Sequence, residues 1–153
     1  MTALFALLIG IVAGLRAMTP LAAVSWAAWL GWLPLAGTLA SFVGHWLAVA
    51  FFTIAALAEF VTDQLPSTPS RKVPQQFGAR LVTGGLSGAA LGVATGSTWV
   101  GLIAGFVGAV IGTYGGAEVR GWLGRAFGRD LPAALIEDAI AVALAWFVVA
   151  NIL

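Results

Sequence analysis

The side chains of this chain that could do chemistry are few, and most of them are charged residues at the edges of long apolar segments. Among 153 residues there are seven Lys or Arg, six Asp or Glu and one His. Cysteine is absent, which excludes disulfides and thiolate ligands, and the single His45 excludes zinc sites built from several His or Cys side chains. Ion pairing, proton transfer and the binding of an ion remain. We expect no metal site, no cofactor and no catalytic residue.

Each of the candidate binding residues lies near the end of an apolar segment, and all of these ends are predicted to lie on the same side of the membrane. The sharpest element is the acidic pair Glu137-Asp138, which follows Pro132 and lies about 8–9 Å into the last segment if that segment is helical. Adjacent side chains point about 100° apart on a helix, so we expect these two acids to have different partners. A buried Asp costs about 2.5–3.5 kcal/mol at the centre of a membrane helix, which predicts arginine partners. The candidate set is Arg16, Thr19, Glu59, Asp63, Arg80, Thr83, Glu118, Arg120, Glu137 and Asp138.

Two interpretations of this set stay open. The charges could form ion pairs that only hold helices together. Alternatively, they could line a polar cavity that opens to the cytoplasm, where a solute or ion replaces one partner. With Thr19 and Thr83 nearby the cavity could coordinate a cation or relay protons, and its arginines could instead hold an anionic lipid head group. The sequence does not fix the sign of the ligand.

The elements that position these residues are predicted to be membrane helices. Hydrophobic residues make up 61% of the chain and charged residues only 8%, against about 25% charged in typical soluble domains. The mean hydropathy is +1.02. We therefore expect an all-α, polytopic transmembrane bundle in a lipid bilayer, formed by residues 1–153 as a single domain. The net charge of +1 gives no indication of a nucleic-acid partner.

The number of membrane spans depends on the first 36 residues, which are too long for one span and barely long enough for two. Arg16 and the Thr19-Pro20 pair interrupt this stretch, and proline disfavours helical backbone at the residue before it. We expect a turn there and hence six spans, with five as the alternative. Flanking helices are predicted at 2–15 and 132–153. The apolar runs are 3–15, 20–36, 38–58, 81–96, 98–117 and 132–153.

Basic residues between the predicted spans set the orientation. They gather in the loops 64–77 and 119–130, whereas the links at 34–37 and 96–98 carry no charge. By the positive-inside rule the two basic loops are cytoplasmic. Both termini are then expected on the outer side.

An internal repeat is predicted from the motif Gly-x-Arg-x-x-Thr, which begins at Gly14 and again at Gly78. The units cover about 14–63 and 78–120, and both contain Ala-Glu near their ends, at Glu59 and Glu118. Each unit would be a two-helix hairpin, so the copies would run parallel. Several transporter folds are built from repeats, with their sites where the repeats meet.

Two functions are consistent with these features. The first is a small transporter or channel-like protein with a cytoplasm-facing polar site for a small solute or ion, assembled as a homo-oligomer because so small a chain encloses a pathway poorly. The second is a structural or accessory subunit that binds a protein partner or lipid through glycine-rich helix surfaces. No phosphate-binding Gly-Lys-Ser/Thr loop or Ser–His pair is evident, so we expect that the protein is not an enzyme.

Four segments resemble a known family. They are GLRAMTP at 14–20, EFVTDQLPSTPSR at 59–71, ARLVTGGLSGAALG at 79–92 and DLPAALIEDAIAV at 130–142. The chain is similar over essentially its whole length to the small bacterial integral membrane proteins of the domain of unknown function 4126 family. This resemblance implies a location in the bacterial inner membrane, and it supplies no activity, ligand or catalytic residue.

Overall fold

Helices form from every apolar segment of the chain in the computed structural model, which describes residues 1–153. The prediction of an all-α fold is confirmed. Three helices, α4, α5 and α6, are long and apolar enough to cross a membrane, and α1 and α3 are shorter apolar helices. The elements are α1 Thr2–Leu15, α2 Thr19–Trp29, the 3-10 turn η1 Ser41–Gly44, α3 Trp46–Thr62, α4 Pro74–Ala94, α5 Thr98–Phe127 and α6 Asp130–Asn151.

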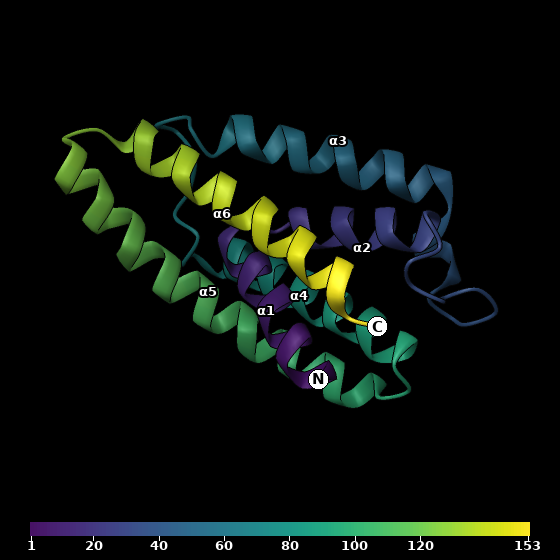
Figure 1. Cartoon of the computed structure of the whole chain (residues 1–153). Helices are drawn as coiled ribbons and strands as arrows, with labels where there is room; N and C mark the ends of the chain where they lie inside the picture. Colours follow the sequence, from purple (N-terminus) through teal and green to yellow (C-terminus); the bar gives the residue numbers. More distant parts are fainter.

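Successive helices run in opposite directions, so the bundle has two distinct ends (Figure 1). One end holds both termini, the α2–α3 connection and the α4–α5 turn, and there the Thr2 hydroxyl donates to Thr95 Oγ1 at 2.9 Å. We call the other end the charged end; it holds the turn at 16–18, the loop at 63–73 and the turn at 128–129. The side of the membrane that each end faces stays a prediction.

The predicted turn between the first two helices is present. Helix α1 ends at Leu15, and Arg16 follows in extended backbone with φ −141° and ψ 117°. Helix α2 starts at Thr19 with Pro20 as its second residue, where the missing backbone N–H costs no helical hydrogen bond.

The next two helices are shorter than the apolar runs 20–36 and 38–58 predict. Helix α2 has 11 residues and α3 has 17. Gly31 follows α2 with φ 79°, a left-handed conformation that stops a helix at little cost only for glycine. Residues 30–45 fold back on the bundle, since Leu33 and Leu35 are almost fully buried. Hydropathy alone does not distinguish such a packed connection from a membrane span.

Glycines bring α1, α4 and α5 into backbone contact and form the tightest part of the bundle. A Cβ on Gly105 of α5 would overlap the carbonyl oxygen of Gly84 on α4, and one on Gly10 of α1 would overlap that of Gly105. The same holds for the pair Gly88 and Gly101. Close helix approach through small residues is the expected packing in a membrane, where apolar burial adds little driving force between helices.

The second predicted basic loop, 119–130, is wrong in its boundary, because most of it belongs to helix α5. Residues 119–127 continue the helix to Phe127 instead of forming a loop, and the chain turns only at Gly128, with φ 67°. Helix α5 therefore has 30 residues and extends beyond the end of α1. By contrast, α3 lies at the periphery and packs mainly against α2 and η1.

Candidate functional site

Arg16 is the centre of a charged cluster at the charged end, and its side chain is fully buried. Its Nη1 donates to Asp63 Oδ2 at 2.9 Å and to the carbonyl oxygen of Leu15 at 3.0 Å. Its Nε donates to Asp138 Oδ1 at 2.6 Å, and Nη1 lies 3.5 Å from Glu137 Oε2. One guanidinium thus joins the α1–α2 turn to the end of α3 and to α6.

The expectation that Glu137 and Asp138 have different partners is only half right. Both contact Arg16, because the planar guanidinium presents its Nε and Nη2 edge to Asp138 and its Nη1 tip to Glu137. Glu137 has in addition two partners of its own. Arg71 donates from Nη1 to Oε1 at 2.5 Å and from Nη2 to Oε2 at 2.9 Å, and Arg120 Nη1 lies 3.3 Å from Oε2.

The broken ends of α1 and α2 are capped by charges from two other helices. Both carboxylate oxygens of Glu59 accept backbone N–H groups at the start of α2, from Ala17 at 2.7 Å and from Met18 at 2.8 Å. Arg80 Nη1 donates to the last carbonyls of α1, at Gly14 with 3.1 Å and Ala13 with 3.4 Å. An acid at a helix start and a base at a helix end both complement the helix dipole.

Seven of the ten predicted site residues take part in this cluster: Arg16, Glu59, Asp63, Arg80, Arg120, Glu137 and Asp138. The hydroxyls of Thr19 and Thr83 are buried near it, and Thr83 donates to the Arg80 carbonyl at 3.3 Å. Glu118 lies outside the cluster. Its side chain is 79% exposed, and its ion pair is with Lys72, at 3.6 Å. It comes two residues after Gly116, which faces the bundle, and so points about 200° away around the helix.

Two members of the cluster were missed by the sequence prediction, Arg71 and Asp130. Arg71 comes from the loop between α3 and α4 and forms the two-contact pair with Glu137. Asp130 begins α6 and accepts from Arg120 Nε at 3.1 Å and Nη2 at 2.6 Å. In the sequence both residues stand within the loops 64–77 and 119–130, whose basic residues set the predicted orientation.

A cavity of about 350 Å³ lies against the cluster at the charged end. The loop after α3 forms one wall, and the small residues Ala117 and Gly121 of α5 leave room opposite. Its charged lining consists of Arg71, Arg80, Arg120, Asp63 and Asp130.

The carboxylates of the cluster already have partners, whereas one arginine is poorly matched. Asp63 and Glu137 are paired with arginines at 2.9 Å or less, and Glu59 accepts two backbone N–H groups. Arg80 is only 2% exposed, its nearest carboxylate oxygens lie 3.9 Å away, and its Nε has no hydrogen-bond partner. The group at the cavity that lacks a hydrogen-bond partner is therefore a positively charged donor, the guanidinium of Arg80.

The two predicted repeat units place their matching residues differently. Arg16 stands in a break between helices, whereas Arg80 lies inside the continuous α4. Glu59 is a buried cap and Glu118 is exposed. The repeat stays a prediction.

Comparison with known proteins identifies the family of the chain. Residues 3–151 match the family model described as Domain of unknown function (DUF4126). The chain belongs to this family. No curated protein and no solved structure matches the chain.

In this DUF4126 chain the cluster falls almost entirely within the four segments that carry the family resemblance. Only Arg120 lies outside 14–20, 59–71, 79–92 and 130–142. The family description names no activity, so the chemistry of the site rests on its geometry.

Proposed function

We propose that the chain is a small transporter of the bacterial inner membrane that binds a small anion in the cavity at its charged end. The observation that carries this proposal is Arg80. A buried guanidinium whose nearest carboxylate oxygens lie 3.9 Å away lines a cavity together with Arg71 and Arg120. Carboxylates, phosphates and sulfates accept the paired hydrogen bonds that a guanidinium offers.

The depth of the cluster supports a role beyond anchoring at the membrane surface. Thr113, which packs beside Gly14 at the α1–α2 turn, is fifteen residues after the start of α5, or about 22 Å along the helix. A bilayer core is about 30 Å thick. If the start of α5 marks the outer edge of the core, the turn lies inside the core, short of its cytoplasmic edge. Charged residues at such depth are commonly functional.

A line of hydroxyls on α4 supports a route away from the cavity. Thr83 and Ser87 follow Arg80 at three- and four-residue spacing, and Ser25 of the adjacent α2 is likewise buried. The hydroxyls of Ser25 and Ser87 have no hydrogen-bond partner, and such groups could bind a passing ion. Fully buried Leu91, one turn beyond Ser87, closes the line. In this proposal the structure is an inward-facing state with its outer path shut.

The accessory-subunit alternative relies on glycine-rich helix surfaces that are free to bind a partner. Many glycines of α1, α4 and α5 instead contact one another inside the bundle, among them Gly10, Gly84, Gly88, Gly101 and Gly105, which favours the transporter over this alternative. Assembly into a homo-oligomer remains part of the transporter proposal.

Uptake of labelled anions into proteoliposomes tests this function. We expect phosphate or sulfate uptake above that of empty liposomes, lost in Arg80→Gln and retained in Arg125→Gln, an exposed arginine outside the cavity. Size-exclusion profiles establish that both variants are folded. Absence of uptake for phosphate, sulfate, nitrate and acetate by the folded wild type would overturn the transport proposal.

A further inference from the structure

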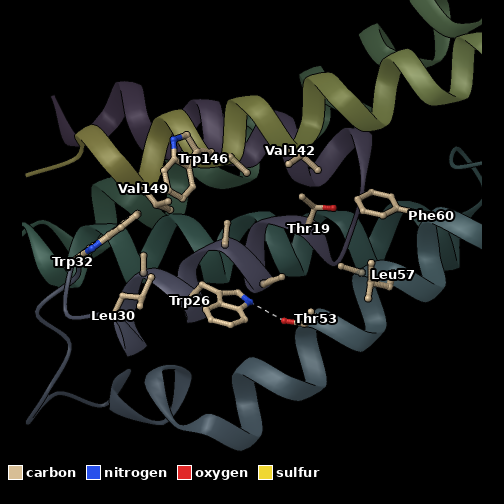
Figure 2. A pocket seen from close by; sticks show the side chains of 15 residues that line it. Thr19, Trp26, Leu30, Trp32, Thr53, Leu57, Phe60, Val142, Trp146 and Val149 are labelled. Carbon is tan, nitrogen blue, oxygen red and sulfur yellow. Dashed lines mark hydrogen bonds between the residues drawn. The ribbon is translucent and has the colours of Figure 1, made fainter.

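A second cavity, unrelated to the charged one, opens at the side of the bundle between α2, α3 and α6 (Figure 2). It has a volume of about 300 Å³ and is lined almost wholly by apolar side chains. It follows α2 from Thr19 to Leu30, which corresponds to about 16 Å. Its larger walls are Trp26, Leu57, Phe60, Trp146 and Val149.

The volume and lining limit what can fill this groove. A space of this size with apolar walls does not hold ordered water, which needs several polar partners. A 16 Å length of helix 10 Å wide occupies on the order of 1,300 Å³, so a helix would lie largely outside the groove. A single extended alkyl chain fits both the shape and the lining, and it would restore the packing contacts that an empty groove forfeits.

One polar atom in the groove is without a partner. The Thr53 hydroxyl accepts from Trp26 Nε1 at 2.9 Å and donates to the Val49 carbonyl at 2.6 Å. Thr19, by contrast, lines the groove at its charged end, and the residue is only 6% exposed. Its hydroxyl has no hydrogen-bond partner. Figure 2 shows it between Val142 and Phe60. A ligand with an alkyl chain and an ester carbonyl would satisfy it.

The partly exposed charges near this end of the groove are negative. Asp138 lies one helical turn before Val142, and Glu59 lies one turn after Ala56, both lining residues. Their side chains are 14% and 12% exposed, whereas Arg16 is fully buried. The known contacts of Asp138 with Arg16 both use Oδ1, which leaves Oδ2 for a cationic group.

From these observations we infer that the groove binds one acyl chain of an amine-bearing phospholipid. The chain lies along α2, its ester carbonyl accepts from Thr19, and its ammonium group pairs with Asp138. The bound lipid fills the space between the peripheral α3 and the rest of the bundle. It stabilises α3, whose own packing is mainly with α2 and η1.

Photo-cross-linking in vesicles tests this inference directly. The full-length protein is reconstituted with phosphatidylethanolamine that carries a diazirine on one acyl chain, and labelled peptides are identified by mass spectrometry. We expect labelling of α2, α3 and α6 at groove residues and a several-fold loss in Ala23→Phe, which fills the groove. Ala143→Phe, on the exposed face of α6, is the matched control and should label like wild type.

Three results would overturn the inference. They are unchanged labelling in Ala23→Phe, equal labelling by a phosphatidylglycerol probe, and a cross-link through the groove to a second copy of the chain. Thr19→Val, which keeps the side-chain volume, adds a test that does not depend on filling the groove. It should weaken labelling by the ethanolamine lipid, and unchanged labelling would remove Thr19 from the site.

Discussion

Arg71 and Glu137 stand 66 positions apart in the chain, yet their side chains meet through two contacts of 2.5 and 2.9 Å. This pair ties the loop after α3 to α6. Gly116 of α5 makes room for it, since a Cβ there would lie 3.0 Å from Arg71 Nη1. Glu137 also faces Arg16 and Arg120, so one carboxylate contacts three cations.

Removing the charge of Glu137 should therefore destabilise the fold strongly. Breaking one partner of a buried pair leaves uncompensated charge and typically costs about 3–5 kcal/mol. We expect Glu137→Gln to lower the free energy of unfolding by an amount on the order of 3 kcal/mol, as measured by SDS titration in mixed micelles. Glu118→Gln is the control, because Glu118 is exposed and its pair with Lys72 is long; its change should stay within about 0.5 kcal/mol. Equal effects of the two variants would show that the network contributes nothing particular to stability.

The glycine contacts give a second prediction. An added methyl in Gly105→Ala would strike the Gly84 carbonyl and force α4 and α5 apart, with a loss of about 1–3 kcal/mol. Gly124→Ala on the same helix has no atom within 4 Å of the new Cβ, and the better helix propensity of alanine should raise stability by up to about 1 kcal/mol. Thermal unfolding in one detergent compares the two directly. A stable Gly105→Ala protein would contradict the close packing of α4 and α5.

The hydroxyl line on α4 predicts a separation of binding from transport. Ser87→Val keeps Arg80 and the cavity but removes a buried hydroxyl and narrows the route. We expect anion uptake into proteoliposomes to fall several-fold while anion binding in detergent is unchanged. Ser67→Val, exposed in the loop after α3 and outside the cavity lining, serves as the control for uptake. Wild-type uptake by Ser87→Val would place the route elsewhere.

The sequence predicted the helical class, the Arg16 turn and most of the cluster because these depend on local signals. Apolar runs, a Thr-Pro break and sparse charges can be identified in a sequence without knowledge of the tertiary contacts. The connection at 30–45 was not, because Leu33 and Leu35 are as apolar as a membrane span and their burial depends on packing.

The differences between the predicted and the observed cluster have physical causes as well. Glu118 was placed by analogy with Glu59 in the predicted repeat, although the helical period sets it on the outer face of α5. Arg71 was missed because a loop's path back to the bundle is a tertiary property that no spacing reveals. The proposed sign of the ligand likewise rests on distances, since only these distinguish the paired carboxylates from the poorly paired Arg80.

The central claim is that the cavity at the charged end binds an anion through Arg80. Isothermal titration of inorganic phosphate and of sulfate into the purified protein in micelles tests it most directly. We predict saturable binding of at least one anion, an affinity at least tenfold lower in Arg80→Gln, which is about 1.4 kcal/mol, and no change in Arg125→Gln. Binding of equal affinity in folded Arg80→Gln, or no binding by the wild type, would contradict the account.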